Sequence, residues 1–243
     1  MKTHKDIFGQ AGIDYLNAED KQKKIKVWCD AAKMDYIPVH YCFRDFNQMP
    51  AIEQKALSLC SGTILDVGAC MGAHSLYLQN MGFDVTALEI SPLSCEVMKR
   101  RGVLKILNQN FLTRKPDTRF DTIIFLMNGA GMAGKIERLP NFFEQLRKHL
   151  NPGGRVFMDS TDLRYLYTDE DGTMLINLND KYYGELIYRI SYNNYKGEKF
   201  PWLFIDEDLL AFHAEKNGFA FKKIMDGSHF DYLAELKIDK LPK

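Results

Sequence analysis

Strand and helix patterns alternate between residues 63 and 160 of this 243-residue chain, and this alternation restricts the fold more than any other feature. Short apolar runs indicate strands, and amphipathic runs closed by glycine indicate helices. Alternation with short connections is typical of parallel β-α-β units in a doubly wound α/β sheet. The predicted strands lie at residues 63–68, 84–90, 103–109, 120–127 and 155–160, and the predicted helices at 73–82, 91–102 and 138–154.

The sequence after residue 160 has a different pattern. An insertion at 164–205 interrupts the alternation and contains a predicted antiparallel β-hairpin that turns near residues 193–199. Asp206 then has the position of a helix N-cap. The elements predicted after it are a helix over 207–218 and strands over 219–227 and 230–238.

Residues 1–60 are predicted to form a mostly helical cap or lid ahead of the sheet. A helix is expected over residues 21–33, with Asn17 or Asp20 as its N-cap. A second helix is expected over 51–60, with Pro50 in its first turn.

Composition excludes several classes of protein. The 32 basic and 32 acidic residues cancel, which argues against a protein that binds the phosphate backbone of nucleic acids. The N-terminus lacks the apolar stretch of a secretory signal, and the longest apolar run, Ile123–Met127, is far shorter than the roughly 20 residues of a membrane span. The five cysteines form no CxxC pair and the histidines show no HxxxH spacing. We therefore expect no metal site, reduced thiols and a cytoplasmic location.

The string ILDVGACMG at residues 64–72 joins a predicted strand to a predicted helix. Glycine lets the backbone approach a ligand, and the N-terminus of the following helix offers free N–H groups. In a doubly wound sheet such a loop lies at the carboxyl ends of the strands, where ligands bind. A tight turn without a ligand is the simpler alternative. A dinucleotide fingerprint fails from Gly68, because Cys70 and Ala73 occupy its second and third glycine positions.

The spacing found, D-x-G-x-x-x-G from Asp66 to Gly72, resembles motif I of class I S-adenosylmethionine-dependent methyltransferases, in which Cys70 replaces the usual middle glycine. The Pro-Gly-Gly turn at 152–154 and the closing order of helix, strand and strand also resemble this family. The strings MNGAG and DSTD resemble a bacterial group of it without a settled substrate. The resemblance implies a Rossmann-like, seven-stranded sheet whose last strand is antiparallel, within a cofactor-binding domain at 61–243.

The resemblance also assigns residues to the cofactor, S-adenosylmethionine. The loop that contains Gly68, Ala69, Cys70 and Gly72 would pass under its methionine part and ribose. Asp66 would order this loop and approach the amino group of the methionine part.

Five more cofactor residues follow from the same resemblance. Glu89 would hold the ribose hydroxyls, although a carboxylate at this place serves NAD equally, and Ile90 would pack on the adenine. Asn110, where the family commonly has an acid, would face the adenine amine, followed by Phe111. Met127 would lie beside the reactive methyl group.

Four residues are candidates for catalysis. Asn128 would orient the nucleophile of the substrate, or simply begin the turn N-G-A-G. Asp159 and Asp162 would bind a cationic substrate or act as a general base, or cap the segment that follows. His74, in the first turn of a helix, would remain a neutral base, or serve only in packing.

Substrate contacts are expected outside the core. The segment YIPVHYCFR at 36–44 would close over the site as a lid, with Tyr41 and Arg44 as substrate contacts. The aromatic hairpin is a second candidate lid, and its alternatives are ordinary sheet packing and a dimer surface. The oligomeric state stays open.

The sequence therefore predicts a methyltransferase that moves a methyl group by in-line displacement to a small or medium-sized soluble substrate. A nicotinamide-dependent oxidoreductase and a non-catalytic nucleotide-binding protein on the same fold are the alternatives. Nucleic acid is a disfavoured substrate, because the chain lacks the NPPY or DPPY string with which the family methylates base amines.

Overall fold

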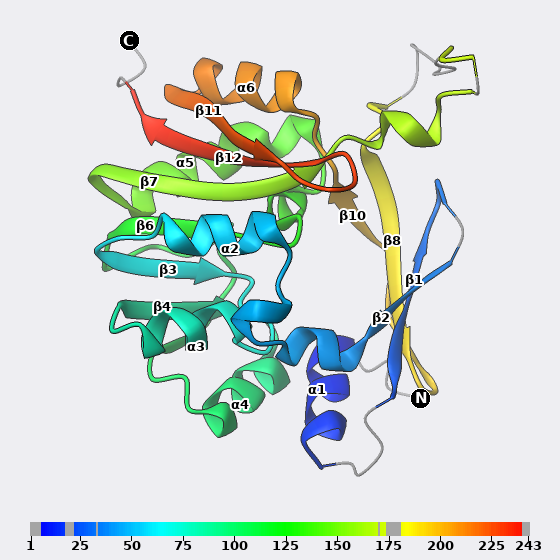
Figure 1. The fold of residues 1–243 in the computed structure, drawn as a ribbon, viewed down its shortest axis with the longest axis vertical. Coiled ribbons are helices and arrows are strands. Elements are labelled where there is room, and N and C mark those ends of the chain that lie inside the picture. Colours follow the sequence, from blue (N-terminus) through cyan, green and yellow to red (C-terminus); the bar gives the residue numbers. More distant parts are fainter. Residues whose placement is uncertain (1–5, 18–21, 33, 170, 174–180, 240–243) are drawn as a thin grey trace.

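The computed structural model describes residues 6–17, 22–32, 34–169, 171–173 and 181–239, which form two β-sheets with helices around the larger one (Figure 1). The large sheet has seven strands in the order β11-β12-β7-β6-β3-β4-β5. The strands from β5 to β7 run parallel, and the last strand, β12, is antiparallel to both of its neighbours. This confirms the predicted topology. The strands are β3 (Thr63–Val67), β4 (Asp84–Glu89), β5 (Ile106–Asn108), β6 (Phe120–Phe125), β7 (Leu150–Thr161), β11 (Phe219–Asp226) and β12 (Asp231–Ile238).

Helices cover both faces of this sheet. In Figure 1, α2 (Ala51–Ser58) and α3 (Ala73–Asn80) lie in front of it, and α5 (Leu139–His149) and α6 (Glu207–Lys216) lie behind it. The apolar sides of α5 and α6 close the main core, where buried phenylalanines of β6 and α5 pack edge to face. The helix α4 (Pro92–Arg101) follows β4.

Local capping residues set the helix ends. The hydroxyl of Ser91 accepts a hydrogen bond from the backbone N–H of Ser94 at 2.9 Å, and Gly102 ends α4 with a φ of 93°. The carboxylate of Asp206 likewise accepts the N–H of Leu209 at 2.9 Å and begins α6.

The second sheet corrects one prediction. Residues expected in a helix over 21–33 instead form the strand β1 (Lys24–Cys29). Residues 21 and 33 of the expected helix lie outside the described residues, and so do the segments 18–20 and 174–180. β1 pairs antiparallel with β2 (Asp35–Pro38) and with β8 (Glu185–Tyr192). The β-branched and aromatic residues of the string IKVW favour a strand once a partner is present, and that partner lies far along the chain.

The predicted hairpin is the other half of this sheet. β8 pairs with β9 (Tyr195–Lys196) and β10 (Phe200–Leu203), so the order is β10-β8-β1-β2. In Figure 1 this sheet stands on the side to which the arrowhead of β3 points, which is the carboxyl edge of the large sheet. The short helical turn η3 (Gly129–Ala133), which follows β6, packs on β10. The insertion therefore extends the sheet of the N-terminal segment and joins it to the large sheet.

The rest of the N-terminal segment is helical. The helix α1 (Ile7–Asn17) packs against α4 and against η1 (Val39–Phe43), and η2 (Phe46–Gln48) leads into α2. Pro50 is the N-cap of α2 rather than a residue of its first turn. Among the helices of the described part of the chain, none combines the length and the apolar character that crossing a membrane requires.

Candidate active site

The glycine loop runs from the end of β3 to the start of α3 with three left-handed residues. Gly68, Cys70 and Gly72 have φ values of 75°, 51° and 79°. Left-handed backbone costs little for glycine and more for other residues, so the middle position is the unusual one. The backbone N–H of Gly68 donates to the carbonyl of Leu88 at 2.8 Å, which ties the loop to β4.

The two glycines have different surroundings. A Cβ atom added at Gly72 would lie 2.9 Å from the Met98 side chain and 3.0 Å from that of Val103, so this glycine is packed against α4 and the segment after it. A Cβ atom at Gly68 would meet only the end of the Met132 side chain, at 3.8 Å. The backbone of Gly68 is therefore open to a ligand on this side.

Glu89 ends β4 directly beside the glycine loop. One oxygen of its carboxylate accepts the backbone N–H of Cys70 at 2.8 Å, and the other accepts that of Ser91 at 2.9 Å. The side chain is 8% exposed, and burial raises its pKa against these hydrogen bonds. The carboxylate therefore shapes the loop and still borders the edge where a ligand of the loop would lie.

Asp66 lies beneath the same loop. The hydroxyl of Ser75 donates to its carboxylate at 2.6 Å, so the first turn of α3 holds the end of β3. Burial raises the pKa of Asp66, while the nearby His74 and the Ser75 hydrogen bond oppose that shift. Ala69 is buried in the loop against Ala87 and Met98. Both predicted residues support the loop from inside the fold.

Three of the remaining predicted cofactor residues have accessible side chains at the carboxyl edge. Ile90 is 64% exposed and Met127 is 40% exposed. Asn110 is also exposed, and its side-chain oxygen accepts the N–H of Leu112 at 2.9 Å.

The side chain of Phe111 lies in the core rather than at the carboxyl edge. Its ring is only 3% exposed and packs edge to face on Phe125, with ring centroids 5.1 Å apart. The side chain is part of the main core, because the turn after β5 directs it under the sheet. Only the backbone of Phe111 is left to contact a ligand.

A buried cluster of charged side chains borders the loop. Glu53 of α2, 3% exposed, forms an ion pair with Arg44 and accepts a hydrogen bond from His74 Nε2, 2.6 Å away. Burial by itself would raise the pKa of Glu53, but the hydrogen bond and charge of His74 and the Arg44 guanidinium outweigh it, and the pKa is lowered. The structure thus brings together Arg44 and His74 through a residue that sequence reasoning missed.

A signal for Glu53 was present in the helix itself. The buried side of α2 consists of Ile52, Glu53, Ala56 and Leu57, so the acid lies on the apolar face. A carboxylate on such a face needs a partner, and both of its partners come from other segments.

Tyr41 lies against Arg44 at the same place. The guanidinium carbon of Arg44 is 4.1 Å from the centre of the Tyr41 ring, and Arg44 Nη1 donates to the Tyr41 carbonyl at 2.7 Å. Burial raises the pKa of Tyr41, and the nearby carboxylates of Glu53 and Asp159 act in the same direction, against Arg44. The predicted pair is therefore together, and Arg44 is in contact with Glu53.

Asp159 approaches this cluster from the end of β7. Its two carboxylate oxygens accept the backbone N–H of Asn128 at 3.0 and 3.1 Å, which joins the ends of β6 and β7. The side chain is buried, and burial raises the pKa of Asp159 to about 7, with a further contribution from Glu53. A carboxyl group that changes charge near neutral pH suits proton transfer.

The side chain of Asn128 already has protein partners. Its nitrogen donates to the Leu203 carbonyl at 3.2 Å, and its oxygen accepts the Ser160 hydroxyl at 3.0 Å. The residue has a φ of 58° and joins β10 to the large sheet. Its predicted role in orienting a nucleophile stays a prediction.

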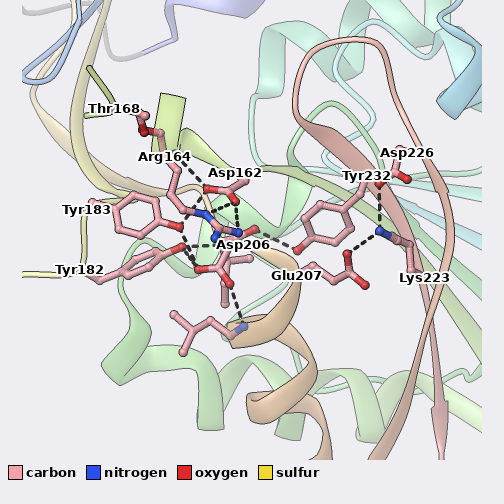
Figure 2. A network of polar contacts seen from close by, with 12 residues as sticks. Asp162, Arg164, Thr168, Tyr182, Tyr183, Asp206, Glu207, Lys223, Asp226 and Tyr232 are labelled. Carbon is pink, nitrogen blue, oxygen red and sulfur yellow. Dashed lines mark hydrogen bonds and ion pairs between the residues drawn. The ribbon is translucent and has the colours of Figure 1, made fainter. Parts of the chain in front are cut away.

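Asp162 belongs to a different network, shown in Figure 2. Its carboxylate accepts hydrogen bonds from the Arg164 backbone at 2.9 Å, the Arg164 side chain at 2.6 Å and the Tyr183 hydroxyl at 2.9 Å. The Tyr183 and Tyr182 hydroxyls also donate to Asp206, the N-cap of α6. This favours the capping alternative for Asp162, which anchors the insertion to the sheet.

Comparison with known proteins identifies the family in which this arrangement of residues occurs. A family model described as a methyltransferase domain matches residues 64–154, which contain the glycine loop, Glu89 and the first strands of the large sheet. Among curated proteins, the cypemycin N-terminal methyltransferase of a Streptomyces species is 27% identical over 103 residues. That alignment covers 41% of this chain and 42% of the relative, so the chain matches about two fifths of its length.

Solved structures extend the likeness over the whole chain. The CcbJ methyltransferase from Streptomyces caelestis has 16% identity and a TM-score of 0.60 over 79% of this chain and 91% of its own, which shows the fold alone. A S-adenosylmethionine-dependent methyltransferase from Bacteroides fragilis, solved with S-adenosyl-L-homocysteine, is 42% identical, with a TM-score of 0.91 over 99% of this chain and 98% of its own. This relative decides between the sequence-based alternatives: the chain belongs to the S-adenosylmethionine-dependent methyltransferases.

Proposed function

We propose that this methyltransferase binds S-adenosylmethionine across the glycine loop and moves its methyl group to a small or medium-sized soluble substrate. The proposal rests on one observation. Glu89 holds the glycine loop by a hydrogen bond, and this loop lies beside the buried cluster of Arg44, Glu53 and His74. The cofactor would supply an activated methyl group, so the protein mainly has to align the nucleophile behind it. Alignment of this kind can lower a barrier by about 7–11 kcal/mol in favourable cases.

The residues at the loop suit this cofactor. Gly68 leaves space for close approach, and Glu89 has two carboxylate oxygens at the edge for ribose hydroxyls. Ile90, exposed beside it, would cover the adenine, with Asn110 at the amine. Met127, exposed at the end of β6, would lie near the methyl group.

We assign proton removal to Asp159. It is the acid at the end of β7 whose pKa is raised to about 7, and Tyr41 lies near enough for their charges to interact. A base with such a pKa would add roughly 10² to 10⁴ in rate if the nucleophile carries a proton at neutral pH. A buried carboxylate also suits an acceptor with an ammonium group. His74 would support Arg44 and Glu53 at the cofactor side of the site.

The segment with Tyr41 and Arg44 would act as the predicted lid, together with the second sheet beside the carboxyl edge. This arrangement would enclose the acceptor group, and the equal numbers of basic and acidic residues support a soluble substrate over a nucleic acid. The five free cysteines support a reducing, cytoplasmic location.

Two measurements test the proposal. Calorimetric titration with S-adenosylmethionine, S-adenosylhomocysteine and NAD(H) should give binding of the first two and little of the third. Incubation with labelled S-adenosylmethionine and fractionated cell extract should then yield a compound heavier by about 14 mass units, the replacement of H by CH₃. Binding without any transfer would contradict the proposed transfer to a soluble substrate. Tight binding of DNA or RNA at 0.15 M salt, with a steep dependence on salt, would contradict the soluble substrate.

A further inference from the structure

Cys70 occupies the one left-handed position of the glycine loop where the family pattern has glycine and this chain does not. Its side chain packs with Cys42 of η1 on Met71 and Val97. Both thiols are free and lie within this one packed cluster. The unusual residue of the loop thus has a matching partner 28 positions earlier, in the segment predicted to be the lid.

Contacts on both sides hold the two segments together. The guanidinium of Arg101 donates to the carbonyl of Met71, in the glycine loop, and to that of Phe43, in η1. The backbone N–H of Cys70 is meanwhile held by Glu89. A change at the Cys42–Cys70 contact would therefore reach the cofactor loop and the lid at once.

The charges around Cys42 favour its thiolate. The hydrogen bond from Cys70 lowers the pKa of Cys42, burial opposes this, and the guanidinium groups of Arg44 and Arg101 lower it further. Burial instead raises the pKa of Cys60 to about 12 and that of Cys95 to about 11. Because the thiolate is the reactive form, Cys42 suits the role of the attacking thiol better than Cys60 or Cys95.

We propose that Cys42 and Cys70 are a site of reversible oxidation, at which a disulfide links the lid to the glycine loop and weakens cofactor binding. This rests on the proposed function, since the loop is taken to bind the cofactor. With hydrogen peroxide as oxidant, the Cys42 sulfur attacks one peroxide oxygen, becomes a sulfenic acid and releases water. The Cys70 thiol then attacks the Cys42 sulfur, the S–S bond forms, and a second water leaves. Two thiols are oxidised and one peroxide is reduced.

The disulfide would disturb the loop. Its sulfur atoms would be bonded at about 2.05 Å, closer than any hydrogen-bonded pair of thiols. The bond would draw the Cys70 side chain toward η1. It would thereby pull the Cys70 backbone from the position in which its N–H donates to Glu89. We expect oxidation to weaken binding of S-adenosylhomocysteine at least tenfold, and bound S-adenosylhomocysteine to slow the oxidation, since the two effects are linked.

The test uses the full-length, reduced protein. After treatment with hydrogen peroxide, a peptide map without reductant should contain one linked pair with Cys42 and Cys70. Calorimetry with S-adenosylhomocysteine should show the weakened binding, which dithiothreitol restores. Cys42→Ser should abolish the linked pair and the oxidant effect. Cys60→Ser is the matched control and should retain both the linked pair and the oxidant effect. A serine hydroxyl can keep the hydrogen bond that this side chain donates to the Ala56 carbonyl.

The outcomes separate the two proposals. Absence of the linked pair, or a linked pair with unchanged affinity, overturns the oxidation site. A reduced protein that binds no S-adenosylhomocysteine refutes the proposed function and with it the effect on the cofactor, while the peptide map still decides whether the disulfide forms.

Discussion

The carboxylate of Glu89 accepts the backbone N–H of Cys70 at 2.8 Å, so the end of β4 holds the middle of the glycine loop. A non-glycine residue with a φ of 51° needs such support, since left-handed backbone is costly for it. The same carboxylate is our candidate for the ribose. The Glu89 side chain therefore orders the loop and would also bind the cofactor that the loop binds.

Replacing Glu89 by Ala should weaken S-adenosylhomocysteine binding by about 1–3 kcal/mol, the cost of losing a charged hydrogen-bonding partner. Calorimetry on variants with unchanged circular dichroism would measure this. Glu96→Ala is the control, because Glu96 is an exposed acid of α4 that pairs with Arg100. Unchanged affinity in a folded Glu89→Ala protein would remove the ribose assignment.

Glu53→Ala should lower the free energy of unfolding by about 3–5 kcal/mol, because it leaves Arg44 as a buried charge without its carboxylate. Urea unfolding measures the change. Glu144→Ala should cost below about 1 kcal/mol, since its pair with Lys148 is on the surface. Equal losses in the two variants would mean that the buried cluster contributes nothing special to stability.

Local patterns predicted most of the large sheet, and distant partners account for the failures. The ends of α4 follow from Ser91 and Gly102, which act on their own neighbours. The helix predicted over 21–33 was wrong because the strand β1 depends on β8, from the last third of the chain.

The same distinction applies to the site. The glycine loop and Glu89 lie on one β-α-β unit, so their spacing was readable. The role of Glu53 depends on Arg44 and His74, which lie on two other segments. The burial of Phe111 depends on packing under the sheet. Such contacts leave little trace in local periodicity.

Asp159 should make stability depend on pH. Its pKa is about 7 in the folded protein and about 3.9 in an unfolded chain. The folded state therefore binds the proton more tightly, and this stabilisation is complete below about pH 4 and is lost as the pH rises to 7. The free energy of unfolding of the wild type, relative to that of Asp159→Asn, should fall by up to about 4 kcal/mol between pH 4 and 8. A constant difference across this range would contradict the raised pKa.

Gly131→Ala should disturb the contact between η3 and the second sheet. The added Cβ would lie 2.3 Å from Nε1 of Trp202, so the indole ring must move. We expect a loss of about 1–3 kcal/mol in stability, the usual cost of overpacking. In a Trp202→Ala background, where the space is free, the same change should cost much less. A double-mutant cycle compares the thermal unfolding of the wild type, the two single variants and the double variant. Equal costs of Gly131→Ala in both backgrounds would show that Trp202 is not the obstacle.

Tyr41→Ala tests the lid. Deleting residues 1–45 would also remove β1, the neighbour of β8, so a point variant is cleaner. If the lid aligns the substrate, methyl transfer in extract should fall at least tenfold while S-adenosylhomocysteine affinity changes little. Tyr165→Ala, at an exposed tyrosine outside residues 36–44, is the control. Full transfer activity in a folded Tyr41→Ala protein would refute the lid.

The pairing of β1 with β8 also affects how the chain is made. Val27 pairs with Ile190, 163 residues later. At about 5–20 residues per second, a ribosome needs roughly 8–30 s to deliver that partner. During this interval one edge of the β1–β2 ribbon is open to strands of other nascent chains. Lys24 and Lys26 lie on β1, and charged lysines on an open edge discourage pairing with a foreign strand. Lys24 and Lys26 thus suit a strand whose partner is made much later.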